Sequence, residues 1–419
     1  MASPSRADQP TPVTAPTPTQ LDDITTAFVE DDDDDDDEDL EGDAEIELGF
    51  VSDIVAGEEH LAGPFVNWDG GKVGGQPTWL DPTVQLDVLC VCETNMSFLL
   101  QIYCPLDAPA AAFHRSLYVF CCRTKGCPKL GHARAFRVQL PRENAYYSDK
   151  EDDAWRNNVA SVKRCVVCGL NGKFACSACH VAQYCSKAHQ KDHWKHGHKT
   201  DCAACAQQQT LVVSDAAAQA MEDDGSAFVF PQYAIHIEQE PDRTVAQNES
   251  EAKMMQAYEQ AHLQPRGDDV FTDDSEIDLS QKDLASMLGT TTQDKTYVGF
   301  LTRVALANDQ VLRYCRWDDD EPVLWVHSEG KANDIPSCSV CNERRRFEFQ
   351  IMPQLLYHLK VSGDLDSLQN GATDLDWGTL AVYTCPNSCS LHQATSTNAD
   401  VVEEFVWRQP PHEQHQAPQ

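Results

Sequence analysis

The chain has few basic residues for its length and no long apolar run. Its 419 residues include 32 Lys and Arg against 67 Asp and Glu, a formal net charge of −35. Phosphate repels such a field, so we expect no direct nucleic-acid binding and consider a basic protein the natural electrostatic partner. No stretch approaches the roughly 18 apolar residues of a membrane span, and residues 1–20 lack the apolar core of a signal peptide.

The motifs of common enzyme classes are also missing. The stretch "GGKVGG" (70–75) lacks the spacing of a phosphate-binding loop, and no Gly-x-Ser-x-Gly elbow occurs. Each Cys-x2-Cys pair has a partner pair elsewhere, so none is needed as a redox pair. We therefore expect a monomeric binding protein that is not an enzyme and has no membrane contact.

Acidic runs dominate two parts of the chain. Positions 30–39 are ten consecutive acids, "EDDDDDDDED", and residues 242–292 are rich in Gln, Asp and Glu. Like charges repel and bury nothing, which predicts disorder for these segments. The N-terminal run is either a solubilising tail or a bait for a basic client.

Apolar segments rich in aromatic and β-branched residues occur on both sides of a central Cys/His-rich stretch. They predict buried strands in a mainly β (α+β) protein. The segments are "FLLQIYCPL" (98–106), "SLYVFCC" (116–122), "FVFPQYAIHIEQEP" (228–241), "YVGFLTRVA" (297–305), "VLRYCRW" (311–317) and "PVLWVHS" (322–328).

The chain has 18 cysteines and no export signal, so the cysteines indicate metal binding more than disulfides. Residues 163–202 contain too few Leu, Ile and Val to form a core. They contain four close ligand pairs, which suffice for two tetrahedral zinc ions. The pairs are Cys165-x2-Cys168, Cys176-x2-Cys179, Cys185-x3-His189 and His198-x3-Cys202.

The stretch 189–202 holds two further histidines, His193 and His196. We expect both on the surface of a helix formed by "KDHWKHGHK" (191–199), with Trp194 packed inward. His196 is an alternative ligand to His198, and Cys205 is an alternative to Cys202.

An internal repeat relates the two β-rich parts. Aligning Cys92 with Cys341 also aligns Phe98 with Phe347, Gln101 with Gln350, Ile102 with Ile351 and Leu106 with Leu355. Aligning Phe120 with Tyr383 places Cys122 on Cys385 and Cys127 one position from Cys389. The repeat predicts two homologous β-rich halves that pack into one body, with the Cys/His-rich segment inserted between them.

Each half also contains two cysteine pairs at the ends of predicted neighbouring strands. Two such turns can share one zinc ion, as in a zinc ribbon. The candidate ligands are Cys338, Cys341, Cys385 and Cys389 in the C-terminal half, and Cys90, Cys92, Cys122 and Cys127 in the N-terminal half. The alternative is that these are reduced core cysteines, and Cys121 could replace Cys122. We expect Cys104 and Cys315 in the core.

The order and spacing of ligands in 163–202 resemble the MYND zinc finger family. The resemblance implies two interleaved sites, one from Cys165, Cys168, Cys185 and His189 and the other from Cys176, Cys179, His198 and Cys202. Most MYND fingers carry cysteine where His189 stands, and imidazole binds zinc equally well. Seven basic residues against two acidic ones give this segment a net charge of +5. MYND fingers bind short proline-containing peptides. The resemblance therefore implies a second possible function for this protein, an adaptor that recruits such peptides of a nuclear co-regulator.

Most of the chain outside the acidic segments resembles the programmed cell death protein 2 family. The resemblance rests on stretches such as "KVGGQPTWLDP" (72–82), "RAFRVQLPREN" (134–144) and "CSVCNERRRFEFQIMPQLLYHL" (338–359). It implies a dedicated chaperone that binds a newly synthesised basic ribosomal protein of the uS5 type and supports 40S ribosome biogenesis. It also implies a cytoplasmic location with nuclear traffic. A groove between the halves would offer the client an edge strand or a cleft.

The expected organisation along the chain combines these predictions. It comprises a disordered acidic segment (1–44), the N-terminal half (45–145), the MYND finger (163–202), a linker (203–225), a strand returning to the body (226–241), a disordered acidic insertion (242–292), the C-terminal half (293–408) and a disordered tail (409–419).

Overall fold

The structure is a computed structural model. It describes residues 46–53, 71–124, 127, 129, 131–144, 146, 162–214, 228–241, 294–319, 322–359, 375–390 and 400–411. The predicted disorder of segments 1–44 and 242–292 therefore lies outside the described residues, as does that of the tail from residue 412.

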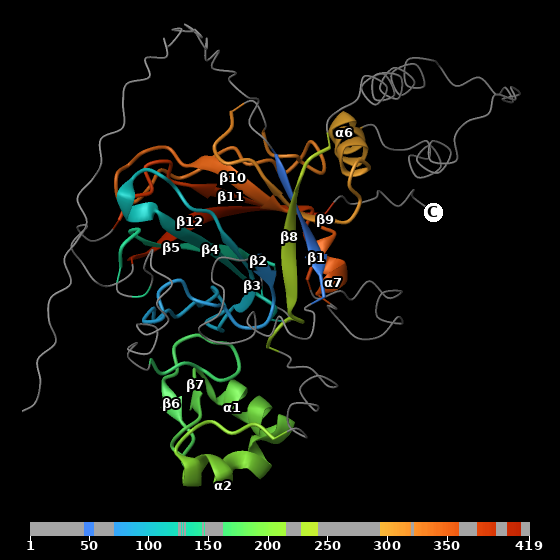
Figure 1. The fold of residues 1–419 in the computed structure, drawn as a ribbon. Coiled ribbons are helices and arrows are strands. Elements are labelled where there is room, and N and C mark those ends of the chain that lie inside the picture. Colours follow the sequence, from blue (N-terminus) through green and yellow to red (C-terminus); the bar gives the residue numbers. More distant parts are fainter. Residues whose placement is uncertain are drawn as a thin grey trace, which may run out of the picture. The chain divides into compact units, whose positions relative to one another are not determined.

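Ten antiparallel strands form a closed barrel, which confirms that the protein is mainly β (Figure 1). The order around the barrel is β1-β8-β2-β3-β4-β5-β12-β11-β10-β9, and β9 pairs with β1 to close it. The strands are β1 (Glu47–Ser52), β2 (Gly71–Val73), β3 (Ser97–Tyr103), β4 (His114–Cys121), β5 (Ala133–Leu140), β8 (Tyr233–Gln239), β9 (Gln310–Tyr314), β10 (Arg346–Ile351), β11 (Thr379–Thr384) and β12 (Asp400–Gln409).

The two halves are joined at two seams and exchange a strand. β5 pairs with β12 at one seam. At the other, β1 from the N-terminal half pairs with β9, and β8, which follows the finger, pairs with β2. Both seams are hydrogen-bonded, so the expectation of a free edge strand between the halves is wrong for the described residues. A closed barrel has no edge to which a client could add a strand.

The repeat predicted from the sequence recurs in the strand register. Phe98 faces Phe120 across β3 and β4, and Phe347 faces Tyr383 across β10 and β11. Each strand pair also has a bulge at the same place, between Phe98 and Leu100 on β3 and between Phe347 and Phe349 on β10. Two aligned glutamines also make equivalent contacts, because Gln101 Oε1 accepts from the Thr78 amide at 2.8 Å and Gln350 Oε1 from the Leu324 amide at 2.7 Å.

Alternation along the strands separates the barrel interior from its outer face. Leu117, Val119 and Cys121 of β4 join a buried cluster that includes Phe349 and Val382 from the other half. Side chains at intervening positions, such as Tyr118 and Phe120, enter a different cluster together with Trp79. Since successive side chains of a strand face opposite sides, the first cluster fills the barrel.

Two of the segments expected to be strands are not strands. Residues 295–304 form helix α6 (Lys295–Val304), in which Asp294 caps the N-terminus by accepting from the Thr296 amide at 2.8 Å. Val298, Phe300 and Val304 are buried on this helix, and a short apolar run of this kind fits a helix or a strand equally well. Residues 322–328 lie alongside the barrel without strand pairing. The barrel also carries η2 (Ala110–Ala112) and α7 (Leu355–His358).

The finger is a small hairpin followed by helices. Its elements are β6 (Phe174–Ala175), β7 (Gln183–Tyr184), α1 (Lys187–His193), the kinked segment η4 (Trp194–His198) and α2 (Lys199–Gln208). The linker expected from residue 203 therefore begins later, because α2 continues to Gln208. Among the described residues, no helix has the length and apolar character needed to cross a membrane.

Candidate metal centres

Four cysteine turns share a left-handed residue and a closing backbone hydrogen bond. In each, the residue after the second cysteine is left-handed, and its amide donates to the carbonyl oxygen of the first cysteine at 2.8–2.9 Å. This turn reverses the chain direction, so both thiols point to the same side. The turns are Cys90–Glu93, Cys165–Gly169, Cys176–His180 and Cys338–Asn342, of which the first is one residue shorter.

The first finger site is formed by the turn 165–169, the end of β7 and helix α1. Cys168 Sγ lies 3.6 Å from Cys185 Sγ, and His189 Nδ1 lies 3.5 Å from Cys165 Sγ and 3.2 Å from Cys185 Sγ. Ser186 caps α1 by accepting from the His189 amide at 3.3 Å, which fixes the helix start one turn before the ligand. The structure thus presents Nδ1 of His189 to the three thiols.

The second finger site joins the turn 176–180 to the kinked helical segment. Cys176 Sγ lies 3.9 Å from Cys202 Sγ, and Cys179 Sγ lies 3.6 Å from His198 Nε2. Gly197 has φ +131°, which interrupts the helix between α1 and α2. Only glycine adopts this conformation readily, and the break lets His198 and Cys202 face the hairpin.

His193, His196 and Trp194 differ from expectation. Both histidines are buried, whereas the Trp194 side chain is 41% exposed. His193 stacks on the ligand His198 with 4.8 Å between ring centroids, and its Nδ1 lies 3.0 Å from the Tyr184 hydroxyl. Burial lowers the pKa of His193 to about 4, so it supports the second site as a neutral ring. His196 bonds the Asp192 carbonyl oxygen at 2.8 Å and is not grouped with the ligands.

Two further clusters lie at the ends of barrel strands. The N-terminal thiol cluster (Cys90, Cys92, Cys122, Cys127) has Sγ–Sγ distances of 3.7 Å for Cys90–Cys127 and 3.8 Å for Cys92–Cys122. The C-terminal thiol cluster (Cys338, Cys341, Cys385, Cys389) has 3.6 Å for Cys341–Cys385 and 3.7 Å for Cys385–Cys389. These are the same groupings that the sequence predicted, and the ligand atoms within each group lie within 4.8 Å of one another.

The remaining cysteines are placed apart from these clusters. Cys121 points into the barrel interior while Cys122 leaves the strand, so alternation along β4 separates them. Cys104 and Cys315 are buried. Cys205 is buried on α2, where its Sγ accepts from the Val212 amide at 3.3 Å, and it does not compete with Cys202.

The donor sets fit zinc. A tetrahedral ion with Zn–S bonds of about 2.3 Å separates its sulfurs by roughly 3.8 Å, and a sulfur and an imidazole nitrogen by roughly 3.5 Å. The distances above match these edges and are far longer than the ~2.05 Å of a disulfide. Four Cys or His ligands without an open position are typical of structural zinc sites. The MYND finger implies zinc, and all four clusters can hold a metal.

The ionisation of the thiols shows why a cation suits these clusters. A hydrogen bond from Cys389 lowers the pKa of Cys341 to about 6, whereas burial raises the pKa of Cys385 to about 11. In the first finger site, burial opposes protonation of His189, but Cys165 and Cys185 raise its pKa to about 9. Without an ion, neighbouring thiols share protons and resist ionising together. A divalent ion stabilises all of them as thiolates and displaces the proton from the histidine.

The finger packs against the N-terminal half. Gln76 Nε2 donates to the Val166 carbonyl oxygen at 2.8 Å, and Trp79 Nε1 donates to that of Gly169 at 3.3 Å. Arg164 lies over the Trp79 ring and donates to the Pro82 carbonyl oxygen at 2.6 Å. Trp79, Leu80 and the finger cysteines belong to one buried cluster. Trp79, Leu80 and Asp81 are therefore core residues, and the finger packs directly on the barrel.

Family profiles match three parts of the chain. Residues 45–154 match "programmed cell death protein 2, N-terminal domain", and residues 294–410 match "programmed cell death protein 2, C-terminal putative domain". Residues 165–202 match the MYND finger. No solved structure gives a significant match.

Several curated proteins are similar over most of their length. Programmed cell death protein 2 of cattle is 36% identical over 358 residues, covering 81% of this chain and 90% of that protein. The rat protein of the same name is 36% identical over 379 residues, covering 87% of this chain and 96% of that protein. Human programmed cell death protein 2-like is 26% identical over 351 residues, 80% of this chain and 90% of that protein. The chain therefore belongs to the programmed cell death protein 2 family, with a MYND finger between its N- and C-terminal domains.

Proposed function

We propose that this protein is a dedicated chaperone for a newly synthesised basic ribosomal protein of the uS5 type and that it supports 40S ribosome biogenesis. Family membership supports the proposal, and the observation that carries it is the charge of −35. Before assembly, a basic client binds RNA nonspecifically. An acidic holder offsets that charge and speeds encounter with the client.

The proposed location is the cytoplasm, with some passage into the nucleus, and the proposed state is a monomer. We also propose that the protein is not an enzyme. Each of the four Cys/His clusters in the described residues offers a complete set of four ligands for a metal ion, which suits folding more than catalysis.

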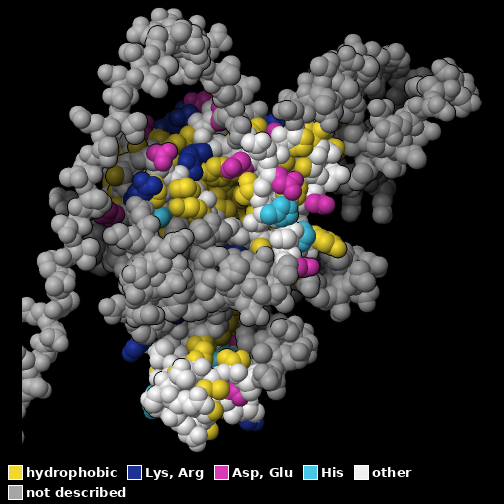
Figure 2. Space-filling model, in the orientation of Figure 1, with side chains coloured by type: hydrophobic (Ala, Val, Ile, Leu, Met, Phe, Trp, Pro, Cys, Tyr) yellow, Lys and Arg dark blue, Asp and Glu magenta, His cyan; other side chains and the backbone are white. Residues whose placement is uncertain are grey.

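The outer surface of the barrel is the proposed client site. The seams are closed by strand pairing, so a client has no edge strand to extend among the described residues. Figure 2 shows hydrophobic side chains gathered in the middle of the described barrel surface, with acidic and basic side chains around them. Such a mixed surface can take apolar and charged contacts together.

A second candidate function is an adaptor in which the finger binds proline-containing peptides. MYND fingers imply protein–protein interaction. Two aromatic side chains of the finger support this candidate, because Phe174 is 53% exposed and Trp194 is 41% exposed. Exposed aromatic rings are frequent anchors for protein partners.

The two functions are separable with surface variants. Deleting the finger would uncover Trp79, so loss of binding after deletion would not identify the finger as the binding site. We therefore suggest purifying the full chain from cells as wild type and as Phe174→Ser/Trp194→Ser. The control is Leu211→Ser, an exposed apolar side chain that follows α2 and lies outside residues 163–202 and the barrel strands. Bound proteins are identified by mass spectrometry.

The chaperone proposal expects a basic small-subunit ribosomal protein with all three chains at moderate salt. Loss of that protein from the finger variant alone would favour the adaptor. Its absence from the wild-type chain would contradict the chaperone proposal.

A further inference from the structure

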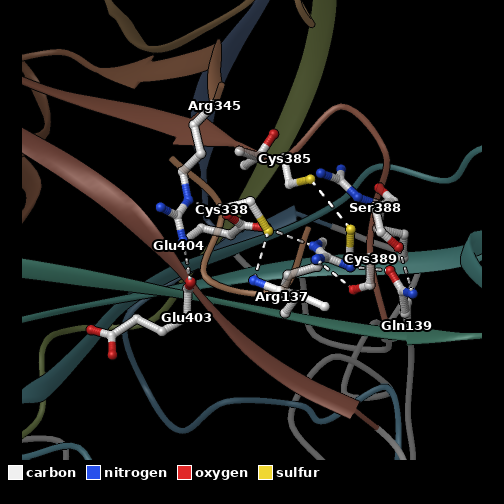
Figure 3. A network of polar contacts seen from close by, with 12 residues as sticks. Arg137, Gln139, Cys338, Arg345, Cys385, Ser388, Cys389, Glu403 and Glu404 are labelled. Atoms are coloured by element: carbon white, nitrogen blue, oxygen red, sulfur yellow. Dashed lines mark hydrogen bonds and ion pairs between the residues drawn. The ribbon is translucent and has the colours of Figure 1, made fainter. Parts of the chain in front are cut away.

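The C-terminal thiol cluster is held by a polar network that spans both halves (Figure 3). Arg137 on β5 of the N-terminal half donates from Nε to Glu404 Oε1 on β12 at 2.8 Å. Its Nη2 donates to the Cys389 carbonyl oxygen at 2.9 Å, and Gln139 Nε2 donates to that of Ser388 at 3.0 Å. One half therefore fixes a ligand turn of the other half.

The second ligand turn is tied to the same carboxylate. Arg345 donates from Nε to Glu404 Oε2 at 2.9 Å, and its Nη1 donates to the carbonyl oxygens of Pro336 at 2.9 Å and Ser337 at 2.7 Å. Ser337 directly precedes the ligand Cys338. Glu404 thus connects both turns of the cluster to the seam between β5 and β12.

The charges of this network favour an anionic neighbour. The side chains of Arg137 and Glu404 are fully buried, and that of Arg345 is 7% exposed. Two guanidiniums against one carboxylate leave an excess of positive charge, which is costly in a buried position. Four thiolates outweigh the charge of one zinc ion, so a loaded site is anionic and compensates the excess. Four neutral thiols would leave the excess positive charge uncompensated.

The N-terminal thiol cluster offers an internal comparison. It has the same donor set at the equivalent strand ends. Its contact with the seam is different, because Arg134 donates to the Leu89 carbonyl oxygen at 3.0 Å and pairs with Glu403 in a solvent-accessible ion pair. Exposed ion pairs contribute little to stability, so this cluster should be coupled only weakly to the seam.

We propose that both thiol clusters are structural four-thiolate zinc sites and that the ion in the C-terminal site fastens the two halves along the β5–β12 seam. This proposal is independent of the chaperone function. It assigns the two sites different mechanical roles despite their common origin in the repeat.

Native mass spectrometry of the intact full chain counts the bound ions. The proposal expects four zinc ions in the wild type and three in each of the ligand variants Cys341→Ser and Cys92→Ser. Val340→Ala changes an exposed side chain between two ligands and should retain four. Two ions in the wild type, as expected for the finger alone, would overturn the proposal.

Hydrogen exchange then tests the fastening. Cys341→Ser should speed amide exchange in residues 133–140 and 400–409, while Cys92→Ser should leave these segments as in the wild type. Equal effects of the two variants on the seam would overturn the assigned role.

A variant that keeps every ligand covers the case in which Cys341→Ser does not fold. Arg137→Gln should retain four zinc ions but release one of them to a chromophoric chelator roughly tenfold faster or more, the usual size of an outer-shell effect. An unchanged release rate would contradict the coupling between Arg137 and the site.

Discussion

Arg115 on β4 and Glu348 on β10 form a bidentate salt bridge inside the barrel, with N–O distances of 2.6 and 2.7 Å. Neither side chain is exposed to solvent. The two residues belong to different halves and are 233 positions apart in the sequence. Tyr314 donates to the same carboxylate at 3.0 Å, and Cys104 Sγ lies 3.0 Å from Arg115 Nη1. The pair therefore fixes how the halves face one another within the barrel.

Removing one partner of this pair should destabilise the protein strongly. Arg115→Met leaves the buried Glu348 carboxylate with only the more distant guanidinium of Arg316, whose Nε lies 3.5 Å from Oε1. Removing one partner of a buried ion pair typically costs about 3–5 kcal/mol. Replacing both, as Arg115→Met/Glu348→Leu, should cost clearly less. Urea unfolding of the three chains measures the difference. A double variant as unstable as the single one would show that the buried charge is not the cause.

The same pair predicts a pH dependence. Burial alone would raise the pKa of Glu348, but Arg115 overrides it and lowers the pKa from 4.5 to about 2. The pair therefore stabilises the fold above about pH 4.5, and this contribution is lost as the pH falls toward 2. Because many other carboxyls titrate in this range, the informative quantity is the difference from Glu348→Gln. That difference should shrink on acidification, and a constant difference would contradict the assignment.

His193 should matter for zinc binding although it is not a ligand. Its ring packs behind His198 and contacts the Tyr184 hydroxyl. We expect His193→Ala to weaken zinc binding at the second finger site by roughly 10- to 100-fold, as for other residues that orient a ligand. Competition with a chelator measures this. His180→Asn, at an exposed left-handed position in the same finger, is the control and should bind as the wild type does.

Trp79 should couple the finger to the N-terminal half. The ring packs on Tyr118 with 4.6 Å between centroids and donates to Gly169 of the finger. Trp79→Ala should cost about 3–5 kcal/mol, as for other buried aromatic residues. Hydrogen exchange should rise both in β4 and in residues 165–171. A change limited to β4 would show that the finger is held independently.

The sequence predicted those parts of the structure that depend on short-range patterns. Close cysteine pairs are local features, so the ligands of all four groups were found from their spacing and the internal repeat. The interleaved division of the finger ligands into two sites came from the resemblance to MYND fingers. The mainly β composition follows from β-branched and aromatic runs such as residues 116–122. The pairing of Phe98 with Phe120 and of Phe347 with Tyr383 shows that the alignment of the repeat also preserved register.

The parts that were missed depend on contacts between distant residues. His193 is buried because Tyr184 and His198 surround it, which the polar sequence of that helix does not indicate. Residues 295–304 form a helix that Asp294 caps, and the apolar run itself fits either structure. The closure of the barrel depends on the pairing of β1 with β8 and β9, far apart in sequence, and this pairing removes the expected edge strand.

The proposed chaperone function is tested most directly by the solubility of the client. A uS5-type ribosomal protein is synthesised in a cell-free system at physiological salt with the purified full chain, or with albumin as an acidic control protein, and is then sedimented. If the protein is such a chaperone, the ribosomal protein stays in the supernatant with the full chain and pellets with albumin. Equal sedimentation in both samples would contradict it.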